Sequence, residues 1–256
     1  MKKEDGGYKV WRSSAPRGIF VLVHGLGAHS ERWAAMADFF LGRNIASYAL
    51  DLPNLNSVSN FYGEILRVRE IAAKDNPGKP VFLVGESLGA LASFLFIAEH
   101  PELFNGLVCI SPAFASRKKI GLPESVKMIA LSRCDPARKV KLPFDSSMCT
   151  RDTDYREKMD NDPLEYRSIS SALVFEILAA QARARSASKK IKLGVLFLLS
   201  GEDMIVDTGV SKKIFDGLSS QDKTLREFSG MYHSLSIELG KEAVFEELFN
   251  WVEKRL

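Results

Sequence analysis

The sequence has few cysteines, no long apolar run and few histidines. Its three cysteines, Cys109, Cys134 and Cys149, are an odd number without metal-ligand spacing, so we expect neither a disulfide framework nor a zinc site. No apolar stretch approaches the roughly 18 residues of a membrane span, and the polar amino terminus lacks the apolar core of a secretory signal. These absences predict a cytoplasmic protein.

The net charge is also small. At +3 it argues against nucleic-acid binding, because basic residues are interspersed with acidic ones along most of the chain. Two basic clusters, residues 117–119 and 183–192, are typical of solvated surface, and the alternative is transient contact with an anionic membrane surface. The sequence leaves the oligomeric state open.

The chain is long enough for one full core. With 256 residues and 46% hydrophobic content, it fits a single domain that carries an inserted subdomain. Strands are predicted at residues 8–11, 19–23, 45–50, 81–84, 107–110, 193–199 and 224–228, and helices at 31–41, 64–75, 88–100, 210–218 and 242–254. This alternation predicts an α/β protein with a mostly parallel sheet flanked by helices. Ser30 is placed to cap the first helix.

The alternation lapses for about eighty residues after residue 112, which is too long for a plain connection. We therefore expect a core of residues 1–112 and 190–256, with a mainly helical cap at 113–189. Within the cap, residues 124–132 and 168–185 are predicted helices, and 142–162 is turn-rich. The longer helix carries only Glu176 as a charge from residue 172 to 180, so it either contacts both core and substrate or is simply buried.

A nucleophile motif lies between a predicted strand and a predicted helix. Residues 85–89 read Gly-Glu-Ser-Leu-Gly, a G-x-S-x-G pattern that would expose Ser87 on a sharp turn at the top of the sheet. The small glycines at positions 85 and 89 let strand and helix approach closely. By itself the motif is equally compatible with an ordinary glycine-rich turn. The rest of the sequence must therefore decide whether Ser87 is a nucleophile.

Two further residues follow in the order that this chemistry needs. A serine hydroxyl requires a base, usually a histidine that a carboxylate orients. His233 follows the last predicted strand, and Asp203 follows the strand before it. Asp207 is the alternative acid, although its place before a helix favours a capping role. The predicted catalytic residues are Ser87, Asp203 and His233.

The same mechanism needs two backbone N–H donors for a developing oxyanion. One is expected from Leu88, directly after the nucleophile. The other is expected from the loop after the first long strand, where His-Gly-Leu-Gly at residues 24–27 lets backbone approach the substrate, with Leu26 as the best candidate. A plain flexible turn is the alternative interpretation of that loop.

With these motifs in view, the chain resembles the α/β-hydrolase superfamily, and within it the monoacylglycerol lipase and lysophospholipase-like serine hydrolases. The resemblance rests on residues 24–32 (oxyanion loop), 85–90 (nucleophile elbow), 201–207 (acid loop), 230–233 (histidine loop), and 150–152 with 162–164 (cap). One motif departs: the group often has Asp-x-x-Gly-His-Gly-x-Ser after the second core strand, where this chain has Leu-Pro-Asn-Leu-Asn-Ser after Asp51.

The resemblance implies a carboxylic-ester hydrolase that forms an acyl-enzyme on Ser87, without a metal or organic cofactor. It favours monoacylglycerols, lysophospholipids or short to medium acyl esters as substrates, with the cap supplying an apolar pocket. Candidate pocket residues, each equally able to be core, are Leu122, Met128, Ile129, Ile169, Leu173, Phe175, Ile177 and Leu178. The alternatives are an amidase or aminopeptidase of the same fold, or a small-molecule receptor with vestigial hydrolysis.

Overall fold

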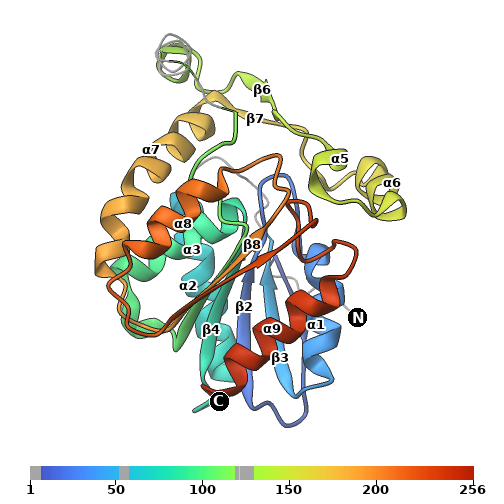
Figure 1. The fold of residues 1–256 in the computed structure, drawn as a ribbon, viewed down its shortest axis with the longest axis vertical. Helices are drawn as coiled ribbons and strands as arrows, with labels where there is room; N and C mark the ends of the chain where they lie inside the picture. The colour runs from blue at the N-terminus through green and yellow to red at the C-terminus, as the bar shows by residue number, and fades with distance from the viewer. Residues whose placement is uncertain (1–6, 52–57, 119–120, 122–129) are drawn as a thin grey trace.

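A seven-stranded sheet forms the centre of the computed structural model, which describes residues 7–51, 58–118, 121 and 130–256 (Figure 1). Its strands are β1 (Tyr8–Trp11), β2 (Gly18–Val23), β3 (Ile45–Leu50), β4 (Val81–Glu86), β5 (Gly106–Ile110), β8 (Val195–Ser200) and β9 (Lys223–Phe228). Their order is β1-β3-β2-β4-β5-β8-β9, and every pair is parallel except β1 with β3. The predicted α/β class with a mostly parallel sheet is confirmed.

Strand order places the catalytic loops. The chain runs from β2 outward to β3 and then returns to β4 on the other side of β2. Loops after β2 and β4 therefore diverge at the carboxyl edge of the sheet, where open α/β sheets form their ligand crevice. Register brings Val23 beside Gly85, so the predicted oxyanion loop and nucleophile elbow start next to each other.

Helices cover both faces of the sheet, as Figure 1 shows. One layer consists of α1 (Ala34–Leu41) and α9 (Lys241–Glu253), which pack on one side with a short 3-10 helix, η1 (Ser30–Trp33). The other side carries α2 (Ser59–Asp75), α3 (Leu88–Glu99) and α8 (Thr208–Asp216). Two short 3-10 helices, η2 (Pro101–Leu103) and η3 (Ser188–Lys190), complete the connections. Strands buried on both faces explain the continuous apolar runs in the sequence.

The predicted cap at Ser30 is wrong. His29 is the N-cap residue of η1, and its side chain accepts a hydrogen bond from the Glu31 amide. Ser30 is buried instead, and its own amide donates to Asp51 Oδ1 at 2.7 Å. The 3-10 turn begins one residue earlier than the helical periodicity indicated.

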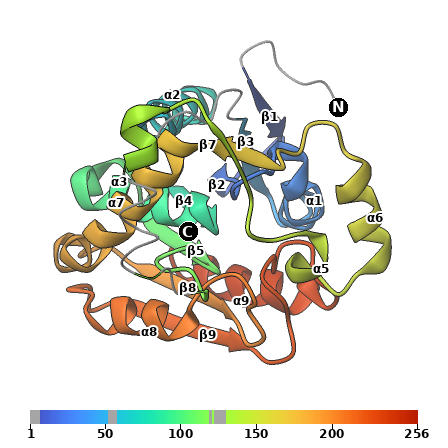
Figure 2. The same cartoon turned by 90° about the horizontal axis from the view of Figure 1, so that it is seen from above.

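The described part of the insertion, residues 113–118, 121 and 130–189, lies over the carboxyl edge of the sheet (Figures 1 and 2). Its described elements are a hairpin of β6 (Lys139–Lys141) with β7 (Ser168–Ser170), and the helices α5 (Ser146–Cys149), α6 (Thr153–Asn161) and α7 (Ser171–Ala187). Viewed from above, α7 lies on one side of β4 and α5 with α6 on the other. The predicted helix at 124–132 falls largely outside the described residues.

The prediction of a turn-rich stretch at 142–162 is wrong, because α5 and α6 both lie within it. Each begins at an aspartate whose side chain accepts a backbone N–H bond, Asp145 from Ser147 and Asp152 from Tyr155. Met159 is the one buried residue of α6, so the helix gave little apolar periodicity to detect.

Within the described residues, no helix is long and apolar enough to cross a bilayer.

Candidate active site

Ser87 stands on a strained turn between β4 and α3. Its φ of 57° and ψ of −120° lie in a region that costs a non-glycine residue about 1–3 kcal/mol. Three backbone hydrogen bonds hold the residue: its N–H donates to Ile110 O at 2.9 Å, and its carbonyl accepts from Leu91 and Ala113, each at 3.1 Å. The strain aims the hydroxyl out of the sheet.

The two glycines of the motif are required by close backbone approach. A Cβ at Gly85 would lie 2.6 Å from Gly89 O, and one at Gly89 would lie 2.2 Å from Val23 O. Real Cβ atoms do not come so near, so any side chain at either position would push α3 away from β2 and β4.

A hydrogen-bonded chain joins the three predicted catalytic residues. His233 Nε2 lies 2.8 Å from Ser87 Oγ, and His233 Nδ1 lies 2.8 Å from Asp203 Oδ2. Asp203 Oδ1 accepts from the backbone N–H groups of Ile205 and Val206, both at 2.9 Å. The carboxylate is therefore fixed by its own loop and presents its second oxygen to the imidazole. Such an arrangement can remove the proton from a serine hydroxyl.

Burial and charge have opposite effects on the pKa values of Asp203 and His233. Burial alone raises the pKa of Asp203, but the His233 charge and the hydrogen bonds to the carboxylate hold that pKa below its usual value. Burial alone lowers the pKa of His233, but the Asp203 carboxylate outweighs it and the pKa of the imidazole is raised. The pair therefore favours a charged carboxylate beside a basic imidazole.

Asp207, the alternative acid, caps a helix. Its side chain accepts from the Val210 amide at 3.1 Å at the start of α8, so the expectation of a capping role is confirmed.

The Arg117 guanidinium, from one of the two basic clusters, donates to the backbone carbonyl of Asp203.

The oxyanion loop is a tight turn beside the nucleophile. Gly25 O accepts from the Ala28 amide at 3.3 Å and from His24 Nδ1 at 2.8 Å, and Gly27 supplies the positive φ of 84°. Burial lowers the pKa of His24 to about 4, so this side chain is neutral near pH 7. A Cβ at Gly25 would lie 3.1 Å from Ser87 Cβ, which shows how near the backbone runs.

A large apolar cavity opens on one side of Ser87. Its volume is about 390 Å³, and Leu26 and Leu88 line it together with Ser87. Of the predicted pocket residues, Ile169, Ile177 and Leu178 also line it. The others lie elsewhere or are not described: Leu173 is fully buried in the core, Phe175 packs against the Arg133 guanidinium, and Leu122, Met128 and Ile129 lie outside the described residues.

The helix α7 contacts both the core and this cavity. Leu173, Ala180 and Ala184 are buried against the core that includes α3, while Val174, Ile177 and Gln181 line the cavity. The helix is therefore not simply buried: one face packs on the core and another borders the cavity, and its contact with substrate stays a prediction.

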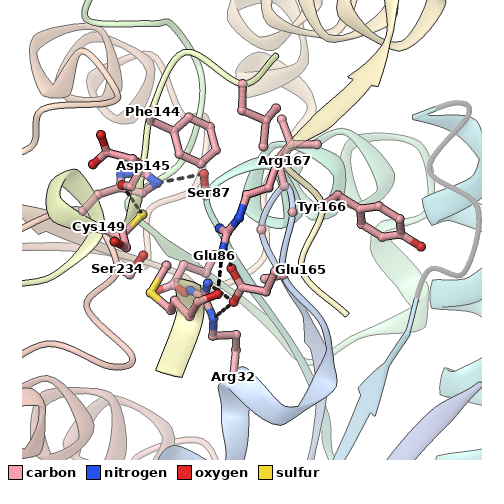
Figure 3. Close-up of a pocket in the computed structure, with 18 residues that line it drawn as sticks. Arg32, Glu86, Ser87, Phe144, Asp145, Cys149, Glu165, Tyr166, Arg167 and Ser234 are labelled. Atoms are coloured by element: carbon pink, nitrogen blue, oxygen red, sulfur yellow. Dashed lines mark hydrogen bonds and ion pairs between the residues drawn. The ribbon is translucent and has the colours of Figure 1, made fainter. Parts of the chain in front are cut away.

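A smaller pocket of about 40 Å³, called here the polar pocket because charged side chains stand in its wall, also adjoins Ser87 (Figure 3). Its wall includes Glu86, Arg32, Glu165 and Arg167 beside Ser87. The Arg32 Nε donates to Glu165 Oε1 at 2.9 Å, and Arg167 Nη1 lies 3.3 Å from Glu165 Oε2. One carboxylate therefore holds both arginines.

Glu86 is a buried carboxyl of the nucleophile motif itself. It accepts from the Ser236 amide at 3.1 Å and from the Ser236 hydroxyl at 2.8 Å. Burial raises the pKa of Glu86. Sequence reasoning missed this residue and the Arg32–Glu165 pair. Position 86 is the unspecified x of the motif, and Glu165 lies 133 residues from its partner.

The insertion is hydrogen-bonded to the predicted acid, histidine and oxyanion loops. Asp207 N–H donates to Ala115 O at 3.0 Å beside the acid loop, and Ser234 N–H donates to Cys149 O at 2.8 Å beside the histidine. At the oxyanion loop, Tyr166 N–H donates to Gly27 O at 3.0 Å. The insertion therefore contacts the loops that carry Asp203 and His233 as well as the loop that follows β2.

Comparison with known proteins agrees with this architecture. The family model described as "Serine aminopeptidase, S33" (Hydrolase_4) matches residues 14–240. The chain is 29% identical to human monoglyceride lipase over 268 residues, covering 98% of this chain and 88% of that protein. It is 26% identical to phospholipase YtpA of Bacillus subtilis over 248 residues, covering 93% and 95%.

A solved structure of similar fold is the monoacylglycerol lipase of Paleococcus ferrophilus. It matches with a TM-score of 0.84 at 28% sequence identity, covering 95% of this chain and 99% of that chain.

Proposed function

This chain belongs to the Hydrolase_4 (serine aminopeptidase, S33) family and is an ester-hydrolysing serine hydrolase of the α/β-hydrolase fold, and from that premise we propose that it cleaves monoacylglycerols through an acyl-enzyme on Ser87. The single observation that carries the proposal is that Ser87 lines both an apolar cavity of about 390 Å³ and a smaller pocket of about 40 Å³ with charged side chains in its wall. An acyl glycerol has one apolar and one polar end.

In the proposed mechanism, Ser87 Oγ attacks the ester carbonyl while His233 Nε2 takes its proton. The Leu26 and Leu88 backbone N–H groups stabilise the oxyanion. His233 then returns the proton to the leaving alcohol, whose departure leaves the acyl-enzyme. Water, deprotonated by the same imidazole, releases the fatty acid. Asp203 stays ionised and holds the imidazole in orientation.

The acyl chain occupies the apolar cavity in this proposal, because its walls are mainly aliphatic. The glycerol occupies the polar pocket, where hydroxyls meet hydrogen-bonding groups. A neutral head group fits better than a phosphate, since Glu165 already pairs with both arginines of the pocket wall, Arg32 and Arg167. This distinguishes the proposal from the phospholipase activity in the name of the Bacillus subtilis relative.

The first test compares wild type with Ser87→Ala on monoacylglycerol, lysophosphatidylcholine and a p-nitrophenyl ester series of increasing acyl length. We expect turnover to fall roughly a million-fold in the variant. We also expect medium or long chains to be preferred, and monoacylglycerol to exceed lysophosphatidylcholine in kcat/KM. Wild-type turnover that survives in Ser87→Ala would remove the proposed nucleophile.

The family description raises a second candidate, cleavage of an aminoacyl amide. Aminoacyl p-nitroanilides assayed beside the esters separate the two. Turnover of the anilides with higher kcat/KM than any ester would replace the ester proposal.

Asp203→Ala and Asp207→Ala test which carboxylate serves the histidine. We expect a large loss of kcat in Asp203→Ala only. Asp207→Ala removes a helix cap and should cost about 1 kcal/mol of stability with little change in kcat. Equal losses of kcat would reopen the assignment.

A further inference from the structure

A second buried carboxylate, Glu238, lies behind the loop that carries His233. This histidine loop comprises residues 229–240, between β9 and α9. Glu238 is 0% exposed and its carboxylate does not line the cavity or the polar pocket. A buried carboxylate is costly unless hydrogen bonds satisfy it, so its partners indicate its role.

The partners of Glu238 belong to both sides of the site. Oε2 accepts from the Tyr232 amide at 2.9 Å, and Tyr232 directly precedes His233. Oε1 accepts from Thr150 Oγ1 at 3.2 Å, the Arg151 amide at 3.1 Å and the Leu239 amide at 2.6 Å. The Arg151 amide also reaches Oε2 at 3.2 Å, and Arg151 Nε lies 3.4 Å from Oε1.

A small apolar cluster reinforces the same junction. Ile237, next to Glu238 in the loop, is buried with Cys149 and Met159 of the insertion. The histidine loop is therefore held against residues 149–151 by the Glu238 carboxylate, by this apolar contact and by two further hydrogen bonds, from Ser234 N–H to Cys149 O at 2.8 Å and from the Arg151 guanidinium to Leu239 O at 3.1 Å. Of these, only the Glu238 carboxylate binds the Tyr232 amide next to His233.

We propose that Glu238 is a positioning residue for the reaction: through the Tyr232 amide it fixes the histidine loop, and with it the imidazole of His233, against Thr150 and Arg151 of the insertion. This inference rests on the proposed role of His233. Glu238 touches neither substrate nor reacting atoms, and its effect is exerted through the backbone.

The substitution Glu238→Gln weakens one link selectively. An amide has one acceptor oxygen in place of two, and its NH2 group cannot accept the hydrogen bonds that the lost oxygen received. The oxygen side of the amide fits the Oε1 position, where Thr150, Arg151 and Leu239 donate. The NH2 group then faces the Tyr232 amide, donor against donor, and that amide must move.

Two control variants separate positioning from general stability. Thr150→Val removes the insertion hydroxyl but leaves Oε2 on the Tyr232 amide. Glu176→Gln makes the same chemical change elsewhere in the insertion, where Glu176 Oε2 accepts from the Val58 amide at 2.6 Å, away from the catalytic loops. Neither should change kcat.

The experiment measures kcat and KM on p-nitrophenyl butyrate, and the thermal midpoint, for wild type and these variants. We expect kcat of Glu238→Gln to fall about 10- to 100-fold with KM within twofold, because small misplacements of catalytic groups cost this much. Thr150→Val and Glu176→Gln should keep kcat within about threefold of wild type. Glu238→Asp keeps both oxygens on a shorter stem and should recover part of the loss. If Glu238→Gln does not fold, Glu238→Asp takes its place in the test. Its kcat should then lie below that of Thr150→Val when the two variants have similar thermal midpoints.

Two results would overturn the inference. One is a folded Glu238→Gln with kcat within twofold of wild type. The other is a kcat that follows the thermal midpoint equally in all variants, which would make the role structural only. Ser87→Ala, run in parallel, tests the proposed function separately: if it abolishes turnover while Glu238→Gln does not, the inference about Glu238 alone has failed.

Discussion

The two sides of the insertion are attached to the core by different kinds of interaction. Residues 142–167, which contain α5 and α6 and are called here the polar side, hold the oxyanion and histidine loops through buried hydrogen bonds and the Arg32–Glu165 ion pair. Helix α7, the apolar side, rests on α3 mainly through aliphatic packing. Directional bonds thus occur where backbone geometry must be fixed, and non-directional packing where a flexible chain is proposed to bind.

The two sides also differ in the volume of the cavities that they border. The polar side lines the pocket of about 40 Å³ beside Ser87, whereas α7 borders only the cavity of about 390 Å³, to which Leu142, Pro143, Phe144 and Met148 also contribute. A small pocket with fixed polar groups can discriminate one head group. A large aliphatic cavity can accept chains of different lengths, since hydrophobic contact has no preferred direction.

The largest contrast should appear in stability. Glu165→Gln leaves the Arg32 charge buried without its carboxylate, and we expect a loss of about 3–5 kcal/mol in the free energy of unfolding. Leu178→Ala on the apolar side removes a half-buried side chain that already borders a cavity, and should cost about 1 kcal/mol. Denaturant unfolding measures both.

Glu157→Gln is the control for that contrast, because Glu157 is exposed on α6, in the same polar side. It should leave stability within about 0.5 kcal/mol of wild type. Equal losses in Glu165→Gln and Leu178→Ala would break the distinction between the two sides.

The second contrast concerns chain length. Ile177→Trp fills part of the apolar cavity, and each methylene that can no longer be buried costs about 0.8 kcal/mol. We expect kcat/KM for a p-nitrophenyl dodecanoate to fall about 10-fold, with the butyrate unchanged. Phe175→Trp is the control. Phe175 lies two residues earlier on α7, packs on Arg133 and does not line the cavity. An equal fall for both esters would contradict binding of the acyl chain beside Ile177.

These contrasts also mark what the sequence could predict. Ser87, Asp203 and His233 each sit in a short local pattern after a strand, so their order along the chain was enough to single them out. Strands β2, β4, β5 and β8 were readable as well, because burial on both faces makes them nearly continuous apolar runs. The confirmed fold class follows from these local signals.

Long-range partners were not readable. The Arg32–Glu165 pair spans 133 residues, and Glu86 meets Ser236 across 150. Nothing in the local sequence distinguishes these carboxyls from solvated ones. The helix α6 was missed for a related reason, since caps and tertiary contacts rather than apolar periodicity define it. Which face of α7 meets the cavity likewise depends on how the helix packs on α3.

The smallest effect expected is a change in pH dependence from the carboxyl nearest the nucleophile in sequence. His233 must be neutral to accept a proton, so kcat/KM should rise with pH through its pKa. Asp203 and Glu86 raise that pKa and Arg32 lowers it, with the Asp203 charge the larger influence after burial. The midpoint of the rise should therefore lie above the ordinary imidazole value of about 6.5.

Glu86→Gln removes one of the charges that raise the pKa of His233, so the midpoint should move to lower pH. The shift should stay under about one pH unit, because the larger Asp203 influence remains. Glu176→Gln, the same change on the apolar side, should leave the midpoint in place. A pH–rate profile of kcat/KM on p-nitrophenyl butyrate measures both variants. A midpoint that moves upward in Glu86→Gln would mean that this carboxyl acts on His233 through its hydrogen bonds to Ser236 rather than through its charge.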